Sequence, residues 1–243
     1  SDVYKRQHCK YLSIKPGLNS LSEAVIVAKE QGIGCLLLEC GVHDEEGENV
    51  EIDFALKIVG QNKDDVKIRG GLDITGKEEE DVFFSDCTVT GAKFSSGICG
   101  SGAALHLKNV RVEKCRGHGI EVVSTSRNTM TDCNVNNNKF SGVCVYDGRM
   151  VIDGSATTIH HNVTGGDSGH YGLKTWNSSS IHLKSLTKES ISTNNGGGGN
   201  YNNAARIATI TAEINNPMKF ACMYCETEMC RRCRDLSTLG SIP

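Results

Sequence analysis

The sequence predicts an all-β chain coiled into a parallel β-helix, a solenoid of short stacked strands. The main observation is a repeat of 23 residues between positions 84 and 145. Its units are short alternating apolar runs broken by Gly, Asn, Ser and Asp, as expected for strands. A period of this length is typical of a solenoid, in which each unit buries its apolar face only against the next. Four columns define the register: Phe84, Leu107 and Met130; Cys87, Val110 and Cys133; Val89, Val112 and Val135; and, at spacings of 22 and 23, Ile98, Ile120 and Val143.

The composition fits one sizeable domain with an appendage. The chain has 243 residues, with 27 Gly and only 3 Pro, which suits many tight corners. Its 26 Lys and Arg and 29 Asp and Glu form no long block of one sign, and 5% of its residues are aromatic. Both features argue against a nucleic-acid partner. No run of 18 apolar residues occurs, so no membrane span is predicted.

The first 16 residues are expected to form a leader without a clear element. Residues 2–7, Asp-Val-Tyr-Lys-Arg-Gln, resemble the translation of a transposon-end adapter used in sequencing libraries. The alternative is an ordinary polar segment. The adapter interpretation predicts an assembled environmental fragment that lacks its own N-terminus. The lack of a visible signal peptide would then carry no information about localisation.

One amphipathic helix is predicted after the leader, from Asn19 to Gly32. Ser20 and Glu23 have the spacing of a capping box, and Gly32 suits the position just after a helix. We expect the apolar face to cover the open end of the solenoid, whose first coil would otherwise expose a strand edge. That face consists of Leu21, Ala24, Val25 and Ala28.

Strand signals begin directly after this helix. They run through Cys35–Leu38, the tripeptide Gly-Val-His at 41–43, Leu56–Gly60 and Val66–Gly70. This order resembles the start of right-handed parallel β-helix proteins of the pectin-lyase-like superfamily, and is especially similar to repeat-rich domains of algal and environmental sequences. The resemblance covers residues 17–213 and implies a right-handed solenoid, for which we expect about seven or eight coils. It implies no single activity, because the superfamily hosts lyases, hydrolases, esterases, adhesins and inert scaffolds.

The register also predicts which cysteines cannot pair. Cys87 and Cys133 share a column two coils apart, as do Cys99 and Cys144. Their Cα atoms should be about 10 Å apart, beyond the reach of a disulfide. We therefore expect free thiols, which favour an intracellular compartment without establishing one.

A cysteine-rich tail follows the solenoid at residues 214–243. Two Cys-x2-Cys pairs could supply four thiolates to a structural zinc ion. The spacer of four residues between the pairs is shorter than in a usual zinc ribbon, and a disulfide set or a frame-shifted or disordered tail are the alternatives. The candidate ligands are Cys222, Cys225, Cys230 and Cys233.

Other polar constellations are weaker. Gly117-His118-Gly119 is similar to a motif of polygalacturonases, but Ser95 and Ser96 lie one coil earlier where paired carboxylates would be needed. We therefore interpret His118 as a polar turn residue. His161, Asp167 and His170 could bind a metal if they converged; the alternative is an ordinary strand end.

Few outward positions of the repeat carry charge. Arg111, Glu113 and Glu121 could bind a sugar or pair across the surface. Trp176, the single tryptophan, is equally compatible with sugar stacking on the surface and with the core. The Asn residues near position 138 fit solenoid turns and could stack between coils.

Two functions of different classes remain. The first is a non-catalytic scaffold or binding module that presents a repeated face to a glycan or a protein, with a possible role for zinc in the tail. The alternative is a carbohydrate-active enzyme, a lyase or hydrolase acting on an acidic polysaccharide. We prefer the first, because no cluster of carboxylates with Arg or Lys is evident on successive coils.

Overall fold

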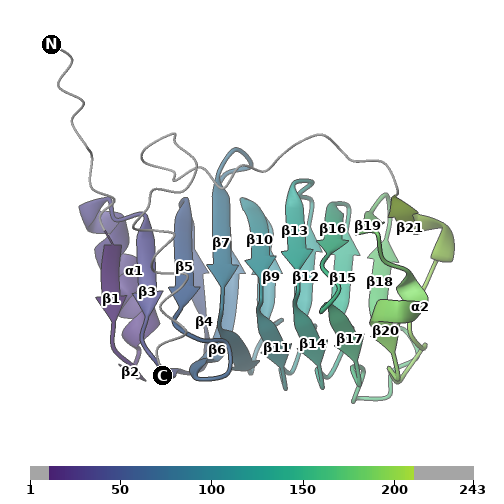
Figure 1. Cartoon of the computed structure of the whole chain (residues 1–243), viewed down its shortest axis with the longest axis horizontal. Helices are drawn as coiled ribbons and strands as arrows, with labels where there is room; N and C mark the ends of the chain where they lie inside the picture. The colour runs from purple at the N-terminus through teal and green to yellow at the C-terminus, as the bar shows by residue number, and fades with distance from the viewer. Residues whose placement is uncertain (1–10, 211–243) are drawn as a thin grey trace, which may run out of the picture.

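The computed structural model describes residues 11–210 and shows a solenoid of parallel strands with a helix at its N-terminal end (Figure 1). The predicted fold class, a parallel β-helix, is confirmed. Residues 2–7 and the cysteine-rich tail with its four candidate zinc ligands lie outside the described residues.

One face of the solenoid is a parallel sheet of nine strands. This exceeds the expected number of about seven or eight coils. One strand that was not expected precedes the helix, within the stretch expected to be a leader. In order, the strands are β1 (Tyr11–Ile14), β3 (Cys35–Leu38), β5 (Leu56–Gly60), β7 (Asp81–Ser85), β10 (Ala104–Lys108), β13 (Asn128–Thr131), β16 (Arg149–Asp153), β19 (Ser180–Lys184) and β21 (Ile207–Ile210).

The other two faces belong to a second sheet of twelve strands. They are joined by β4 (Gly41–Ile52) and β6 (Val66–Ile74), because β6 pairs with β8 through its first half and with β9 through its second. One face continues through β8 (Thr88–Gly91), β11 (Arg111–Glu113), β14 (Asn134–Asn136), β17 (Thr158–His160) and β20 (Ser192–Thr193). The other continues through β9 (Ile98–Gly100), β12 (Ile120–Val123), β15 (Val143–Tyr146) and β18 (Leu173–Trp176), and the short β2 (Gly17–Leu18) pairs with β4.

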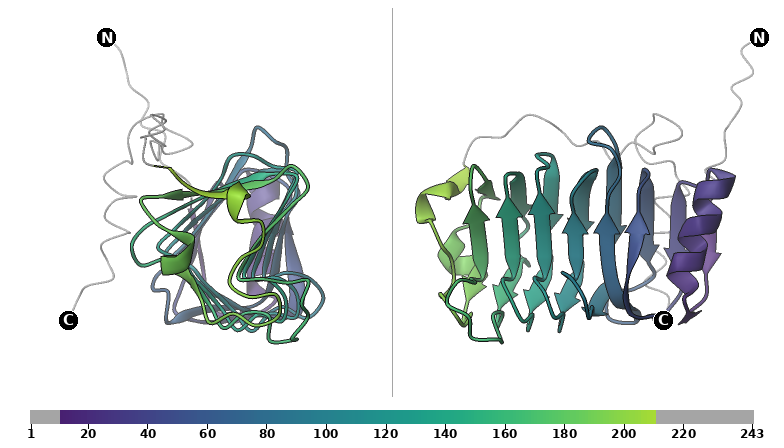
Figure 2. Two further views of the ribbon diagram at one scale, coloured as in Figure 1. Left: turned by 90° about the vertical axis from the view of Figure 1, so that its right-hand side faces the viewer. Right: turned by 180° about the vertical axis from the view of Figure 1, so that it is seen from behind.

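The coils superpose around a common interior when viewed along the solenoid axis (Figure 2). The predicted register is confirmed, since Leu107 pairs with Phe84 on one side and with Met130 on the other. These side chains are almost fully buried, as are those of the neighbouring columns. Each coil therefore covers the apolar face of the previous one. The columns Val89–Val112–Val135 and Ile98–Ile120–Val143 pair in the same way.

A column of glycines lets the coils approach closely just before β12, β15 and β18. A Cβ atom added to Gly119 would lie 2.7 Å from the carbonyl oxygen of Gly142. One added to Gly142 would lie 2.8 Å from the carbonyl oxygen of Gly172. No side chain fits at these distances. Gly119, the last residue of the Gly-His-Gly motif, is thus explained by the packing of successive coils.

Buried asparagines connect the coils at a neighbouring corner. The Nδ2 group of Asn138 donates to Oδ1 of Asn162 at 2.9 Å, and Nδ2 of Asn162 donates to Oδ1 of Asn195 at 3.1 Å. The same two Oδ1 atoms accept the backbone N–H groups of residues 138 and 162. The expected Asn stacking is therefore present, and it pairs corner N–H groups that the strands leave unpaired.

The N-terminal helix α1 (Ser20–Gln31) buries the four residues predicted for its apolar face, and Gly32 ends it in a left-handed conformation as expected. The predicted capping box is wrong, because Ser20 lies inside the helix and its Oγ bonds Nδ1 of His43 at 2.9 Å. The buried Glu45 carboxylate instead accepts the N–H groups of Leu21 and Ser22, at 2.8 and 3.3 Å. A negative charge at this end also favours the helix dipole.

The remaining helical elements are short: α2 (Lys188–Ile191) and a 3-10 turn, η1 (Ala204–Arg206). Across residues 11–210, no helix has both the length and the apolar character needed to cross a bilayer.

The cysteines of the repeat are held apart as predicted. Within the described part of the chain, Cys87, Cys99, Cys133 and Cys144 form no disulfide. Burial raises the pKa of the Cys99, Cys133 and Cys144 thiols to about 12. They therefore stay protonated at neutral pH and pack as small apolar side chains.

Replacing Asn162 by alanine is expected to lower the free energy of unfolding by about 1–3 kcal/mol, because it leaves buried donors without acceptors. Chemical denaturation measures this change. Ser178→Ala, a change at an exposed position, serves as the control and should stay within about 0.5 kcal/mol of the parent. Equal stability of the two variants would contradict a structural role for the Asn column.

Candidate functional site

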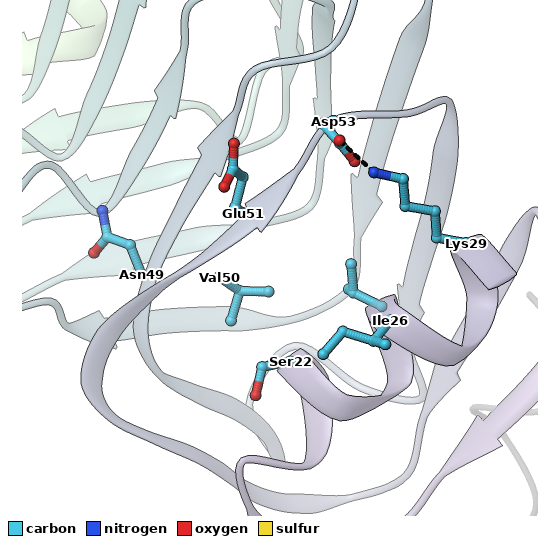
Figure 3. Close-up of a pocket in the computed structure, with 8 residues that line it drawn as sticks. Ser22, Ile26, Lys29, Asn49, Val50, Glu51 and Asp53 are labelled. Atoms are coloured by element: carbon cyan, nitrogen blue, oxygen red, sulfur yellow. Dashed lines mark hydrogen bonds and ion pairs between the residues drawn. The ribbon is translucent and has the colours of Figure 1, made fainter.

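One surface depression lies between α1 and the second half of β4 (Figure 3). Its volume is about 290 Å³. Lys29 and Asp53 form an ion pair at one side, and Glu51 accepts a hydrogen bond from Thr75 at 2.9 Å. Since these charged groups already have partners and Val50 forms an apolar wall, the depression is best understood as the seam between helix and solenoid.

A second depression lies on the outer surface of β12, β15 and β18 and has a volume of about 240 Å³. We call it the groove. Side chains alternate between core and surface along each strand, so parallel stacking places its outward residues in columns. The groove is lined by His118, Glu121, Cys144, Tyr146, Lys174 and Trp176.

Two columns run through the groove on adjacent coils. Cys144 pairs with Glu121 on one side and with Lys174 on the other. Tyr146 pairs with Trp176, and these rings are 40% and 49% exposed. Trp176 is thus a surface residue, which decides between the two positions that the sequence allowed.

The groove carries a cation beside its larger ring. The Nζ atom of Lys174 lies 4.9 Å from the centroid of the Trp176 ring. The stem of Lys174 is buried at the groove floor, with 9% of the residue exposed. This contact fixes the ammonium group next to the aromatic face, where a cation is attracted by the ring.

A stack of rings lies beside the groove and includes the lining residue His118. Phe140 and His170 stack with their centroids 4.4 Å apart, and His118 meets the edge of His170 at 5.1 Å. The Nδ1 atom of His118 accepts the backbone N–H of Ser141 at 3.1 Å. This bond places the proton of the neutral ring on Nε2.

His118 is uncharged at neutral pH. Burial, together with the nearby His170 and Lys174, lowers the pKa of His118 from 6.5 to about 3. Burial is the largest of these causes because the ring loses the water that would solvate its charged form. His118 therefore offers the groove an apolar ring face and a neutral N–H donor.

Glu121 supplies the carboxylate among the groove-lining side chains. Its Oε2 accepts a hydrogen bond from Oγ of Ser96 at 2.7 Å, which fixes the carboxylate on β12. A glycosidase of the two-carboxylate type needs a second carboxyl group on the opposite side of the bond. Ring faces with a few fixed polar groups are instead the usual composition of a site that orients a small polar ligand.

The three charged outward residues expected from the repeat do not converge. Arg111 forms an ion pair with Asp64 at 2.8 Å, and Glu113 contacts Lys114 at 3.4 Å. Both lie on β11, on a different face from Glu121 on β12. Surface pairing therefore accounts for Arg111 and Glu113, and only Glu121 belongs to the groove.

The hypothesis of a metal site at His161, Asp167 and His170 is wrong. His161 contacts His160 through their Nδ1 atoms at 2.8 Å, while His170 stacks on Phe140. The Oδ2 atom of Asp167 lies 3.9 Å from Nε2 of His170. Within residues 11–210, no group of three His, Cys, Asp or Glu side chains could share a metal ion.

Lys174 and the pairing of Tyr146 with Trp176 were missed from the sequence because the repeat is interrupted before β18. Val143 pairs with Leu173, a spacing of 30 residues instead of 23. A signal was present nonetheless. Aligning Gly142-Val143 with Gly172-Leu173 places Tyr146 beside Trp176 and Cys144 beside Lys174.

The fold agrees with comparison to known proteins. A family model described as "right handed beta helix region" matches residues 34–187, more than half of the chain. No curated protein and no solved structure matches the chain significantly.

The half-buried, neutral His118 should make stability depend on pH. Between about pH 6.5 and pH 3, the unfolded chain binds a proton that folded His118 does not, so the free energy of unfolding falls as the pH falls. His118→Asn keeps an acceptor for Ser141 and should reduce this slope by up to about 1.4 kcal/mol per pH unit. Denaturation from pH 7 to pH 4 measures it, with the exposed His161→Asn as control. Parallel pH curves for the parent and His118→Asn would contradict the assignment.

Proposed function

The chain belongs to the right-handed β-helix family, and from that premise we propose that it is a non-catalytic binding module whose groove holds a glycan. The observation that carries this proposal is the pair of exposed rings, Tyr146 and Trp176, on adjacent coils. Their spacing follows the distance between parallel strands, about 4.8 Å. Two neighbouring ring faces can thus contact the apolar face of a sugar.

The polar groups beside these rings support a sugar ligand. Lys174 offers N–H donors and Glu121 offers carboxylate acceptors at the groove floor. Sugar hydroxyl groups both donate and accept hydrogen bonds, so they can use both side chains. A protein partner would favour a larger apolar surface, and the groove of about 240 Å³ better fits a single sugar unit.

The positions of Glu121 and Lys174 allow a direct test of the alternative, a polysaccharide lyase. Glu121 and Lys174 stand in one column, two coils apart. A lyase needs a base that removes the proton α to a uronate carboxylate, and a lysine could do so. Incubation with polyuronate, followed by the absorbance of the unsaturated product, tests this directly. Product formation that Lys174→Ala abolishes would overturn the non-catalytic proposal.

Trp176→Ala is expected to weaken glycan binding roughly ten- to hundredfold, because the stacking surface is lost. Isothermal titration against a panel of soluble polysaccharides measures the affinity. Tyr11→Ala is a matched control, since Tyr11 is 50% exposed but lies on β1 at the far end of the solenoid. Trp176→Phe should retain part of the affinity. Equal affinities of the alanine variants would contradict the groove as the binding site.

For the tail, we propose that Cys222, Cys225, Cys230 and Cys233 bind a structural zinc ion. The two Cys-x2-Cys pairs support this, and four thiolates would leave no open position for a substrate. Zinc measured on the purified chain should fall when Cys230 and Cys233 are replaced by Ser. The control is Cys40→Ser, at an exposed position within the solenoid. Equal, near-zero zinc in both variants would end the proposal.

A further inference from the structure

A line of three cations runs along the corner of the solenoid beside the groove. Lys93, Arg116 and Lys139 are 23 residues apart and all are exposed. They stack on successive coils, since the N–H of Arg116 donates to the carbonyl oxygen of Ala92 and the N–H of Lys139 to that of Cys115, both at 2.9 Å. With about 4.8 Å between coils, the line runs parallel to the solenoid axis for about 10 Å. We call it the cation ladder.

The ladder cations form no ion pair within residues 11–210, although the stem of Lys93 packs on Gly47, between Glu46 and Glu48. No carboxylate within residues 11–210 forms an ion pair with Lys93, Arg116 or Lys139, whereas Arg69 pairs with Asp44 and Arg111 with Asp64. Lys93 has a minor effect on the lowered pKa of Asp44, whose main cause is the hydrogen bond from Arg69. The chain has a net charge of −3, so the ladder is not part of a generally basic surface.

The ladder runs beside the groove. The Nζ atom of Lys139 lies 5.5 Å from the centroid of the Phe140 ring, and this ring lies 5.7 Å from the ring of the groove residue His118. Arg116 precedes the groove residue His118 by two positions. Next to Lys93, the ring of Phe94 is 74% exposed. A ligand in the groove therefore lies beside the cations.

We propose that the cation ladder selects an anionic polysaccharide, laid along the solenoid axis with its charged groups against Lys93, Arg116 and Lys139. This rests on the proposed glycan-binding groove and adds a charge requirement to it. Regularly spaced like charges along a flexible chain match cations repeated at each coil. Uronate carboxylates and sulfate esters share this chemistry.

A single-stranded nucleic acid is also a linear polyanion, but it fits this corner less well. Such partners bind through aromatic side chains on which successive bases stack. Along this corner Phe94 and Phe140 are separated by Gly117 at the intervening 23-residue position, so the stacking surface is interrupted.

Affinity measurements on the full chain test the ladder. The anionic probes are dextran sulfate and polygalacturonate. Unsulfated dextran is the uncharged control for dextran sulfate, and oligo(dT) represents single-stranded nucleic acid. In the ladder variant Lys93→Gln, Arg116→Gln and Lys139→Gln are combined. The control variant combines Lys15→Gln, Lys67→Gln and Lys77→Gln, three exposed cations elsewhere on the solenoid with the same total charge. Circular dichroism confirms that both variants fold.

The parent should bind at least one anionic glycan more tightly than dextran, and less tightly as salt is raised. The ladder variant should lose roughly tenfold in that affinity, from three exposed charge contacts, and the control variant should lose little. A preference for dextran sulfate identifies sulfate as the recognised group, and a preference for polygalacturonate identifies carboxylate.

Equal losses in the two triple variants, tighter binding of oligo(dT), or no binding of either anionic glycan would each overturn the proposal. Trp176→Ala separates it from the groove. If only Trp176→Ala loses glycan binding, the groove is the binding site and the proposal for the ladder is wrong. If only the ladder variant loses glycan binding, the ladder contributes to binding and the proposal for the groove is wrong.

Discussion

The fold of residues 11–210 depends on one constraint, the in-register stacking of parallel coils through backbone hydrogen bonds. No coil can bury its apolar face alone, so each residue position is tied to the same position one coil away. Gly119 shows how tightly: its missing side chain leaves room for the carbonyl oxygen of Gly142. Asn138 and Asn162 show how the corners are completed, by side chains that replace the hydrogen bonds that strands lack there.

The same constraint turns sequence period into surface chemistry. A charge repeated every 23 residues is scattered in the sequence but becomes a line of adjacent charges on the solenoid. This is why composition argues against a basic stripe, while the structure contains the row Lys93, Arg116 and Lys139. Repulsion between such exposed cations is moderate in water. The row persists because backbone pairing, and not side-chain attraction, sets its spacing.

The sequence predicts most of the fold for this reason, and less of the site. The columns through Leu107, Val112 and Ile120 follow from counting residues, as does the separation of Cys87 from Cys133. The cap on α1 does not, because Glu45 reaches the helix from another coil while the local pattern pointed to Ser20. The ion pair of Arg111 could not be predicted for a similar reason, since its partner Asp64 lies outside the repeat columns.

The groove lies where the repeat is interrupted. A strict period of 23 residues would extend the Glu121–Cys144 column without change of geometry, but the step from Val143 to Leu173 is 30 residues long. The additional residues bring His170 against Phe140 and His118, and His118 lines the groove. A flat face of stacked strands offers no concavity, and specific ligand sites are concave. The interruption therefore places a stack of rings beside the groove of Trp176 and Lys174, and it also explains why a search for the 23-residue period does not find these two residues.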